Sequence, residues 1–288
     1  MKKIGVVANI SKPQWLPTAR SIVEFLVERG VRIFFSPEEA ASAVFPEGTS
    51  PQKGRLIDAD MVFSLGGDGT FLKAVRLIGE REVPIAGVNL GGLGFLAEFS
   101  ANNFLSSLDK ILAGDFRIDE RMTLEASLIR EGKIIRTDRA LNDVVIRGAG
   151  VSRVSVLETS IDDEYLTTYE ADGLIVATPT GSTAYSLSAD GPIVDPALAA
   201  IIITPICPHA LSNRPILVPP PKTVTIRPLA IPEGARITVD GQTAIELLCD
   251  DTLRVARSEK NVKLITTTET SYFEILRSKL GWGGSKEL

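Results

Sequence analysis

Hydrophobic positions in the first 117 residues follow two alternating patterns. Short, continuous apolar runs are typical of buried strands, and they occupy residues 4–8, 31–35, 60–65 and 84–88. Between these runs, apolar side chains recur at helical spacing over residues 17–29, 71–78 and 104–112. We expect residues 36–54, which contain prolines and glycines, to form a loop. The alternation predicts an α/β domain with a doubly wound parallel sheet, whose ligands bind at the carboxyl ends of the strands.

The pattern changes at about residue 115, after which β-rich runs follow one another with few helical stretches. Such runs occupy residues 124–129, 144–146, 154–157 and 237–239. Turn signals of the kind that punctuate antiparallel sheets stand at Asp162-Asp163, at residues 219–221 and at Asp240-Gly241. The second half of the chain is therefore predicted to be a β-rich antiparallel domain.

These patterns predict two domains. The α/β nucleotide-binding domain covers residues 1–117, and the β-rich domain covers residues 118–265. Residues 272–280 again have helical spacing, and we expect the segment 266–288 to pack back on the first domain.

The composition excludes nucleic acid as a partner. With 31 Lys and Arg residues against 36 Asp and Glu residues, the net charge is −5 at pH 7. No global positive field draws such a chain to a phosphodiester backbone. The charge of a bound nucleotide has to be met locally, by backbone N–H groups, a few well-placed cations and a metal ion carried with the phosphates.

The apolar segments and the cysteines indicate where in the cell the protein is expected. The first apolar run is broken at Asn9, which argues against a secretory signal. The run at residues 198–203 is far shorter than the roughly 20 residues that a membrane span needs. Cys207 and Cys249 form no C-x-x-C pair, and with the single His209 they cannot make a four-ligand zinc site. We expect buried, reduced thiols in a cytoplasmic protein.

A glycine-rich loop joins the third predicted strand to the second predicted helix, with the sequence Gly66-Gly67-Asp68-Gly69-Thr70. Glycines let a backbone approach phosphate oxygens closely, and helix N-termini attract anions. The simpler alternative is a tight turn in which Asp68 or Thr70 only caps the helix. Capping accounts for one polar residue but not for three glycines around a carboxylate, so we favour a functional loop.

This motif resembles the signature shared by NAD kinases, diacylglycerol and sphingosine kinases and, more distantly, phosphofructokinases. The resemblance implies that Asp68 is the catalytic base for an acceptor hydroxyl, while the donor phosphates are bound by Gly66, Gly67, Gly69 and Thr70. It also implies Mg²⁺ or another divalent metal, carried by the nucleotide phosphates and not by a metal site of the protein. The motif alone leaves the acceptor open.

A second glycine cluster follows the fourth predicted strand, at residues 89–96. Residues 92–97 match the dinucleotide fingerprint G-x-G-x-x-A, but that fingerprint normally follows the first strand, where this chain has residues 9–13. The stretch instead resembles the G-x-N-x-G-x-L-G-F-L segment of NAD kinases. The resemblance places Phe95 against the bound nucleotide, and a core aromatic side chain is the equally weighted alternative.

Residues 172–188 form the most distinctive segment, in which an apolar strand runs into a loop rich in hydroxyl side chains. Such a loop offers many hydrogen-bond donors and acceptors but no charge, which suits a ribose or a carboxamide. A solvated Ser/Thr turn is the alternative. The segment resembles the T-P-x-G-S-T-A-Y block of NAD kinases, with its preceding D-G and apolar strand. Lipid kinases with the same glycine-rich loop lack this block.

Further residues match NAD kinase motifs in the same order along the chain. Asn142-Asp143 resembles a pair that binds the nicotinamide-side ribose in that family. Asp240-Gly241-Gln242 is first of all a hairpin signal, and Glu170 stands where many relatives have a basic residue. The resemblance implies that NAD is contacted by Asp68, Gly69, Phe95, Asn142, Asp143, Arg153, Glu170, Asp172, Thr180, Thr183, Ala184, Tyr185, Ser186, Leu187, Ser188 and Gln242.

The resemblance extends from residue 4 to about residue 264. It implies phosphoryl transfer from ATP, another nucleoside triphosphate or polyphosphate to the 2′-hydroxyl of the adenosine ribose of NAD, giving NADP. It further implies a cytoplasmic homo-oligomer, a dimer or tetramer, with NAD and ATP as ligands. Two alternatives are a lipid or small-alcohol kinase with the same glycine-rich loop and a non-catalytic NAD-binding regulator.

Overall fold

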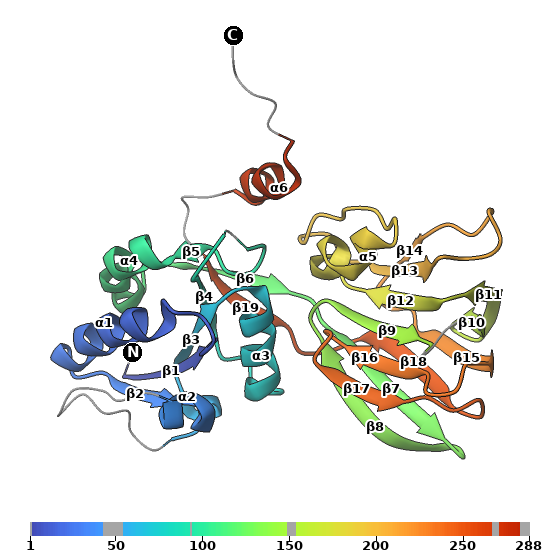
Figure 1. Cartoon of the computed structure of the whole chain (residues 1–288), viewed down its shortest axis with the longest axis horizontal. Coiled ribbons are helices and arrows are strands. Elements are labelled where there is room, and N and C mark those ends of the chain that lie inside the picture. Colours follow the sequence, from blue (N-terminus) through green and yellow to red (C-terminus); the bar gives the residue numbers. More distant parts are fainter. Residues whose placement is uncertain (1, 43–53, 93, 149–153, 267–270, 283–288) are drawn as a thin grey trace, which may run out of the picture. The chain divides into compact units, whose positions relative to one another are not determined.

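The chain folds into two compact units in a computed structural model, which describes residues 2–42, 54–92, 94–148, 154–266 and 271–282 (Figure 1). The first unit combines Met1–Glu120 with Val262–Leu288, and the second unit consists of Arg121–Asn261. Each unit has its own hydrophobic core.

A seven-stranded sheet forms the centre of the first unit. Its strand order is β2-β1-β3-β4-β19-β6, and β5 also pairs with β4. The strands are β1 (Lys3–Ala8), β2 (Arg32–Phe35), β3 (Met61–Gly66), β4 (Ile85–Asn89), β5 (Phe99–Ser100), β6 (Arg117–Arg121) and β19 (Val262–Thr266). The pairs of β1 with β2 and β3, and of β4 with β3, β5 and β19, are all parallel. The predicted parallel sheet is confirmed.

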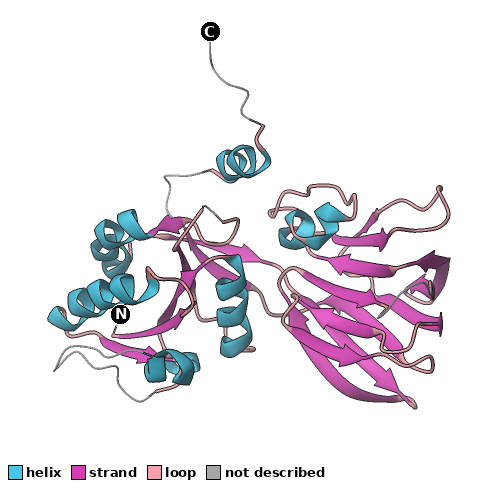
Figure 2. Cartoon of the chain, viewed as in Figure 1, coloured by secondary structure: helices cyan, strands magenta, loops and turns pink. Residues whose placement is uncertain are grey.

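Helices cover both faces of this sheet (Figure 2). They are α1 (Trp15–Glu28), α2 (Pro37–Ser42), η1 (Leu56–Asp58), α3 (Asp68–Ile78) and α4 (Ala101–Ala113), and a further helix, α6 (Tyr272–Leu280), follows later in the sequence. α1 and α4 share one core with the sheet, in which the rings of Phe63 and Phe104 meet edge to face at 4.9 Å. α3 lies on the opposite face and buries Phe71 completely. This two-sided cover is the predicted doubly wound arrangement.

The structure bears on two further predictions, the loop over residues 36–54 and the helix over residues 272–280. The loop expected over residues 36–54 is wrong at its start, because α2 forms there with Glu38 and Glu39 in its first turn, where the helix dipole favours acidic residues. Residues 43–53 lie outside the described part. The predicted helix over residues 272–280 is present as α6, and Ser271 and Glu274 form its capping box. The packing of residues 266–288 stays a prediction.

The second unit is a sandwich of two six-stranded antiparallel sheets (Figure 2). One sheet has the order β11-β10-β15-β18-β7-β8, and the other has the order β14-β13-β12-β9-β16-β17. The first is made of β7 (Leu124–Arg130), β8 (Lys133–Ala140), β10 (Ser155–Ile161), β11 (Glu164–Ala171), β15 (Val224–Ala230) and β18 (Thr252–Arg257). The second is made of β9 (Asp143–Arg147), β12 (Gly173–Ala177), β13 (Ile201–Ile206), β14 (Ile216–Val218), β16 (Arg236–Val239) and β17 (Thr243–Glu246).

The central strands β12 and β13 of the second sheet are buried on both faces. The inner face of this sheet shares a core with the other sheet, through residues such as Leu174, Ile203 and Leu253. Its outer face forms a second core around Ile175 and Ile202, covered by the segment that contains η2 (Thr180–Thr183) and α5 (Tyr185–Ser188). Continuous burial of β12 and β13 follows from this double cover.

The cysteines correct one expectation. Cys207 and Cys249 are unpaired, but both are exposed, so the predicted burial of the thiols is wrong. Cys207 follows the last residue of β13 with a positive φ of 46°, and Cys249 lies in the turn before β18, so neither is part of a packed strand. No helix in the described part of the chain has the length and apolar character needed to cross a membrane.

Candidate active site

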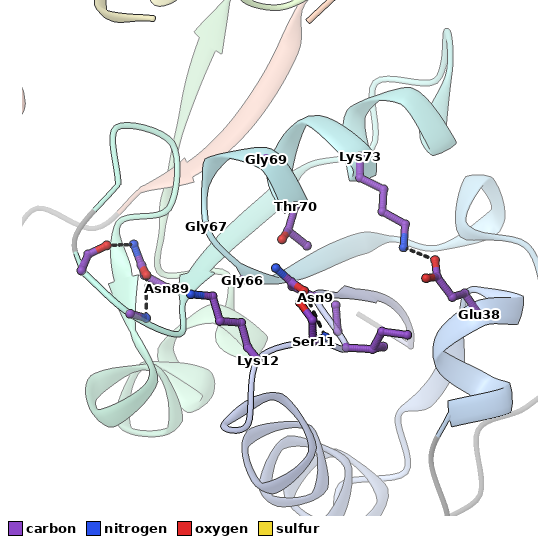
Figure 3. A pocket seen from close by; sticks show the side chains of 14 residues that line it. Asn9, Ser11, Lys12, Glu38, Gly66, Gly67, Gly69, Thr70, Lys73 and Asn89 are labelled. Carbon is purple, nitrogen blue, oxygen red and sulfur yellow. Dashed lines mark hydrogen bonds and ion pairs between the residues drawn. The ribbon is translucent and has the colours of Figure 1, made fainter. Parts of the chain in front are cut away.

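A cavity of about 530 Å³ opens at the carboxyl ends of β1, β3 and β4, which are neighbours in the parallel sheet of the first unit (Figure 3). Each of the three loops that follow these strands supplies part of its wall. The lining residues are Ala8, Asn9, Ile10, Ser11, Lys12, Glu38, Gly66, Gly67, Gly69, Thr70, Lys73, Asn89, Gly91 and Gly92. This is the edge at which open α/β sheets bind their ligands.

Two asparagine side chains fold the loops around this cavity. The Asn9 Oδ1 atom accepts hydrogen bonds from the backbone N–H of Ser11 at 3.1 Å and from its hydroxyl at 2.6 Å. The Asn89 amide accepts from the Gly91 N–H at 2.8 Å and donates to the Gly92 carbonyl. Asparagine favours such local turns because its side chain bonds backbone groups about two residues on. The loops are therefore held without a ligand.

The three glycines at the junction of β3 and α3 have different surroundings. A Cβ atom added to Gly66 would overlap the Thr70 side chain, so the fold itself requires this glycine. A Cβ atom added to Gly67 or Gly69 would meet no atom of the described residues within 4 Å. Gly67 has a φ of −145°, an extended conformation that any residue can adopt. The space beside both glycines lies at the N-terminus of α3, where N–H groups and the helix dipole favour an anion.

Lys12 and Lys73 bring positive charge to the wall of the cavity (Figure 3). The Lys73 ammonium contacts the Glu38 carboxylate at 2.6 Å and that of the fully buried Glu39 at 3.0 Å. Burial lowers the pKa of Lys73, but the hydrogen bonds to both glutamates outweigh burial and raise this pKa above its usual value. From the sequence we expected a few local cations but did not identify them. Their positions could have indicated them, since Lys12 follows the first strand and Lys73 lies one helical turn after Thr70.

Asp68, the first residue of α3, faces the loop that follows β4. Its Oδ2 atom accepts from the Phe95 N–H and its Oδ1 atom from the Leu96 N–H, both at 3.0 Å. Gly94 permits this approach, because a Cβ atom there would overlap the Asp68 carboxylate. Each carboxylate oxygen keeps a lone pair for another donor. Asp68 is thus half-buried and fixed in orientation. Phe95 is half-buried as well, so it is not a core aromatic residue.

Three loops of the second unit meet at the start of β9, because β9 pairs with both β12 and β16. We call residues 141–143, the loop 178–183 and the β16–β17 hairpin the three-loop cluster. The Thr178 hydroxyl donates to the Leu141 carbonyl at 2.5 Å, and the Thr178 N–H donates to the Asn142 carbonyl at 2.9 Å. Gly181 lies so close that an added Cβ atom would overlap the Asn142 carbonyl. The first two loops are therefore packed backbone to backbone.

Two carboxylates lie within the three-loop cluster. Asp143 is only 5% exposed, and burial raises its pKa to about 7, with help from the negative charge of Asp240 and against a hydrogen bond from the Tyr185 N–H. The Asp240 carboxylate accepts backbone N–H groups from Leu141 at 2.9 Å, Asn142 at 2.7 Å and Asp143 at 3.2 Å. Burial raises the pKa of Asp240 too, against these hydrogen bonds. The sequence indicated only a turn at Asp240.

Several hydroxyls of residues 172–188 are engaged inside the protein. The Ser182 hydroxyl donates to the Pro179 carbonyl at 2.6 Å and accepts from the Val194 N–H at 3.0 Å. The Ser186 and Thr204 hydroxyls share a hydrogen bond of 2.9 Å, and both residues are fully buried. These side chains serve the fold. The predicted NAD contacts of this segment with partial or full exposure are Asp172, Thr183, Ala184, Tyr185, Leu187 and Ser188.

Two predicted NAD contacts lie away from the three-loop cluster. β12 runs from Gly173, next to Asp172, to Ala177, which pairs with Asp143. At about 3.3 Å per residue, the two ends of β12 are roughly 13 Å apart. Glu170 and Asp172 are exposed at the far end.

The remaining predicted contacts of the second unit have mixed positions. Thr180 is buried beside Arg121, whose Nη1 atom lies 3.4 Å from the Thr180 hydroxyl. Gln242 is half-buried in the β16–β17 hairpin, where its N–H donates to the Val239 carbonyl at 3.0 Å. Arg153 lies outside the described residues. The structure therefore gathers Asn142, Asp143, Thr180 and Gln242 in the cluster.

An anion cavity at the carboxyl edge of a parallel sheet, beside a fixed carboxylate, is the arrangement of an α/β nucleotide-dependent phosphotransferase. The family model of the ATP-NAD kinase N-terminal domain matches residues 4–116, and that of the ATP-NAD kinase C-terminal domain matches residues 141–267. The chain therefore belongs to the NAD kinase family.

Similar proteins span the whole chain. It is 44% identical to an NAD kinase of Geotalea daltonii, over 98% of this chain and 99% of that protein. It is also 44% identical to an NAD kinase of Moorella thermoacetica, over 100% and 92%. Among solved structures, yeast NADH kinase complexed with NADH has a TM-score of 0.86 at 29% identity, over 100% of this chain and 90% of that one. An Archaeoglobus fulgidus NAD kinase in complex with ATP shares the fold, with a TM-score of 0.76 at 24% identity, over 98% and 100%.

Proposed function

We propose that this chain is an NAD kinase, which transfers the terminal phosphoryl group of ATP to the 2′-hydroxyl of the adenosine ribose of NAD and so forms NADP. Membership of the ATP-NAD kinase family over both units supports the activity. The observation that carries the catalytic assignment is the Asp68 carboxylate, which two backbone N–H groups hold at the N-terminus of α3.

The donor phosphates bind in the cavity of the first unit. The uncrowded glycines Gly67 and Gly69 leave room for phosphate oxygens at the N-terminus of α3. Lys12 supplies local positive charge that a chain of net charge −5 needs for a polyanionic donor. Lys73, which is paired with Glu38 and Glu39, adds an N–H donor to the same wall. Gly66 and Thr70 are further proposed phosphate-binding residues of this loop. Position 66 requires glycine, because a Cβ atom there would overlap the Thr70 side chain.

Mg²⁺ or another divalent metal enters with the donor. The described residues contain no group of three or more His, Cys, Asp or Glu side chains that could hold a metal ion. A nucleotide-bound ion needs only one or two protein ligands beside the phosphates. When bound, such an ion neutralises phosphate charge.

Asp68 acts as the base of the transfer. The 2′-oxygen of NAD attacks the terminal phosphorus of ATP, its proton passes to Asp68, and the bond from that phosphorus to the bridging oxygen breaks to release ADP. The two backbone hydrogen bonds to Asp68 fix the direction of its free lone pairs. Phosphoryl transfer depends mainly on such positioning and on charge stabilisation.

For the acceptor NAD, the proposed contacts of the first unit are Asp68, Gly69 and Phe95. Asn142 and Asp143 bind ribose hydroxyls, and the half-buried Thr183, Ala184, Tyr185 and Leu187 support a contact surface beside them. The remaining proposed contacts are Arg153, Glu170, Asp172, Thr180, Ser186, Ser188 and Gln242.

We also place the chain in a homo-oligomer in the cytoplasm. The position of Glu170 and Asp172 at the far end of β12 supports contacts from these residues to NAD bound by a second copy. Unpaired cysteines suit a reducing compartment. Mixing Asp68→Asn with Asp172→Ala protein tests the oligomer: activity should return in mixed assemblies. A mixed assembly without recovery would contradict a contact between copies.

The activity is tested by incubating the pure protein with NAD, Mg²⁺ and one donor at a time: ATP, another nucleoside triphosphate, or polyphosphate. A strictly NADP-dependent dehydrogenase then detects NADP, and a parallel reaction with NADH tests the reduced acceptor. We expect NADP with ATP, formed about 10²- to 10⁴-fold more slowly by the Asp68→Asn variant. No NADP with any donor would overturn the proposal.

A further inference from the structure

Asp240 occupies a left-handed position in the hairpin between β16 and β17. Its φ is 50°, and the following Gly241 has a φ of 64°. Two successive residues of this kind form the tight turn that suits the twist of a hairpin, and aspartate tolerates the conformation better than most residues do. The hairpin brings the Asp240 carboxylate to the start of β9.

Three successive backbone N–H groups converge on this one carboxylate. Oδ1 accepts from Asn142 at 2.7 Å and from Asp143 at 3.2 Å, while Oδ2 accepts from Leu141 at 2.9 Å. The Asp240 N–H in turn donates to the Asp143 carbonyl at 2.9 Å. Successive N–H groups that point to one centre form an anion-binding concavity. Here an internal side chain occupies it and fixes the backbone of residues 141–143.

The opposite side of residues 141–143 is held as well. Thr178 bonds the carbonyls of Leu141 and Asn142, and Gly181 is packed on the Asn142 backbone. The N–H groups of this turn are thus bound by Asp240, and its carbonyls by Thr178. Asn142 and Asp143 have little backbone freedom left to lose when a ligand binds.

We propose that Asp240 is a positioning residue for the acceptor substrate: by holding the backbone of residues 141–143, it fixes Asn142 and Asp143 in the conformation that binds NAD. This role rests on the proposed contact of Asn142 and Asp143 with NAD. Asp240 acts through these two residues and has no contact with the donor. Its loss therefore weakens NAD binding and leaves ATP binding unchanged.

The variant Asp240→Asn tests this role. Asparagine has nearly the same volume and tolerates a positive φ, but its NH₂ group replaces an oxygen that accepts backbone N–H groups. Asp162→Asn is the matched control, because Asp162 also lies in a hairpin of this unit with a φ of 49° and also accepts a backbone N–H, from Thr223 at 2.8 Å. The KM values for NAD and ATP, kcat and the melting temperature are measured for both variants.

We expect Asp240→Asn to raise the KM for NAD by about 10- to 100-fold, the cost of a misplaced binding group. The KM for ATP should stay within about twofold of the parent value, because the donor cavity shares no residue with this hairpin. Asp162→Asn should leave both KM values unchanged. A purely structural role of Asp240 would not separate the two substrates.

Three outcomes would overturn the proposal. One is a folded Asp240→Asn variant with the parental KM for NAD, and another is an equal rise of both KM values. If Asp240→Asn does not fold, Asp240→Gly relieves the positive φ and is measured instead. Failure of both to fold, while Asp162→Asn folds, would make Asp240 a stability residue and overturn its positioning role.

Asn142→Ala separates this inference from the function on which it rests. If Asn142→Ala raises the KM for NAD and a folded Asp240→Asn does not, only the positioning role fails. If Asn142→Ala leaves the KM for NAD unchanged, the contact of this turn with NAD fails, and the role of Asp240 fails with it.

Discussion

The glycines of the two units differ in what they leave room for. In the first unit, the space beside Gly67 and Gly69 is open, and an added Cβ atom would meet no described atom within 4 Å. In the second unit, Gly181 is in contact with the Asn142 backbone, and an added Cβ atom would overlap its carbonyl. The first loop is open for a ligand, whereas the shape of the second is set by its own backbone.

The polar groups of the two regions follow the same division. Lys12 and Lys73 bring cations to the wall of an open cavity. In the second unit, the hydroxyls of Thr178, Ser182 and Ser186 are buried and bonded within the protein. Charge at an open wall suits a donor polyphosphate, and a rigid scaffold suits recognition of an uncharged ribose.

Asp68→Asn gives the largest effect and tests whether catalysis belongs to the first unit alone. We expect kcat to fall by about 10²- to 10⁴-fold, the usual contribution of a positioned base. NAD binding, measured by calorimetry, should stay within about threefold of the parent value, because the three-loop cluster is unchanged. Asparagine keeps one oxygen to accept a backbone N–H but places its NH₂ group against the other N–H, so the melting temperature should fall modestly.

Substantial NADP formation by Asp68→Asn would remove Asp68 from the mechanism. A loss of NAD binding as large as the loss of kcat would contradict the division between the two units. Glu274→Gln is a matched acidic control, since this carboxylate caps α6 and lines no part of the cavity.

Gly69→Ala and Gly181→Ala test the comparison of the glycines directly. Alanine at position 69 has room in the first turn of α3 and favours a helix, so stability should rise by about 0.5–1 kcal/mol. The same methyl group blocks the approach of phosphate, and we expect the KM for ATP to rise about tenfold. Alanine at position 181 should instead lower the stability by about 1–3 kcal/mol, because backbone atoms cannot move aside cheaply.

Urea unfolding and initial rates measure these two variants. The comparison fails if Gly69→Ala destabilises the protein while it leaves the KM for ATP unchanged. It also fails if Gly181→Ala is as stable as the parent.

Lys73→Met tests whether the cavity wall contributes to ATP binding, and its expected effect is smaller. Methionine keeps the apolar stem of the side chain and removes its charge. We expect the KM for ATP to rise by about three- to tenfold, and the KM for NAD to stay unchanged. Initial rates at varied ATP measure the change. Lys222→Met, which removes an exposed cation that pairs with Asp162, is the control. An equal effect of both variants would show a general charge effect in place of a local one.

Much of the fold and part of the site were predictable from the sequence. Continuous apolar runs predict the strands of the parallel sheet, because strands buried on both faces are continuous hydrophobic segments. Apolar residues at helical spacing predict the helices between them. The motif around Asp68 predicts a functional loop, and the structure has this motif at the junction of a strand and a helix. The family motifs point to Asn142 and Asp143. In each case the signal lies in neighbouring residues.

The rest depends on contacts between distant segments, which local patterns do not contain. Asp240 lies nearly a hundred positions from Asn142 in the chain, and only the pairing of β16 with β9 brings them together. Lys73 pairs with Glu38 and Glu39 of α2. We did not predict this helix, because its segment contains prolines and glycines. The separation of Asp172 from Asp143 follows from the register of β12, which no local motif encodes.

The pH dependence of stability tests the rigid three-loop cluster. The pKa of Asp143 is raised to about 7 in the folded protein, against an ordinary aspartate value near 4 in the unfolded chain. The folded state therefore binds more protons between these values. The contribution of Asp143 to stability is therefore greatest below pH 4 and is lost as the pH rises through 7. The groups that face Asp143 are Asp240, whose charge is itself countered by Arg139, and the Tyr185 N–H.

Asp143→Asn should flatten this dependence and make the free protein more stable than the parent at pH 8, by roughly 2–4 kcal/mol. Asp251→Asn should do the opposite. Burial raises the pKa of Asp251, but its hydrogen bonds to Arg130 outweigh burial and lower it, so this carboxylate stabilises the fold above pH 4. Urea unfolding from pH 4 to pH 8 measures both. If both variants lose stability at pH 8, the fold stabilises the charged form of Asp143. Burial of Asp143 in the three-loop cluster would then cost the free protein no stability.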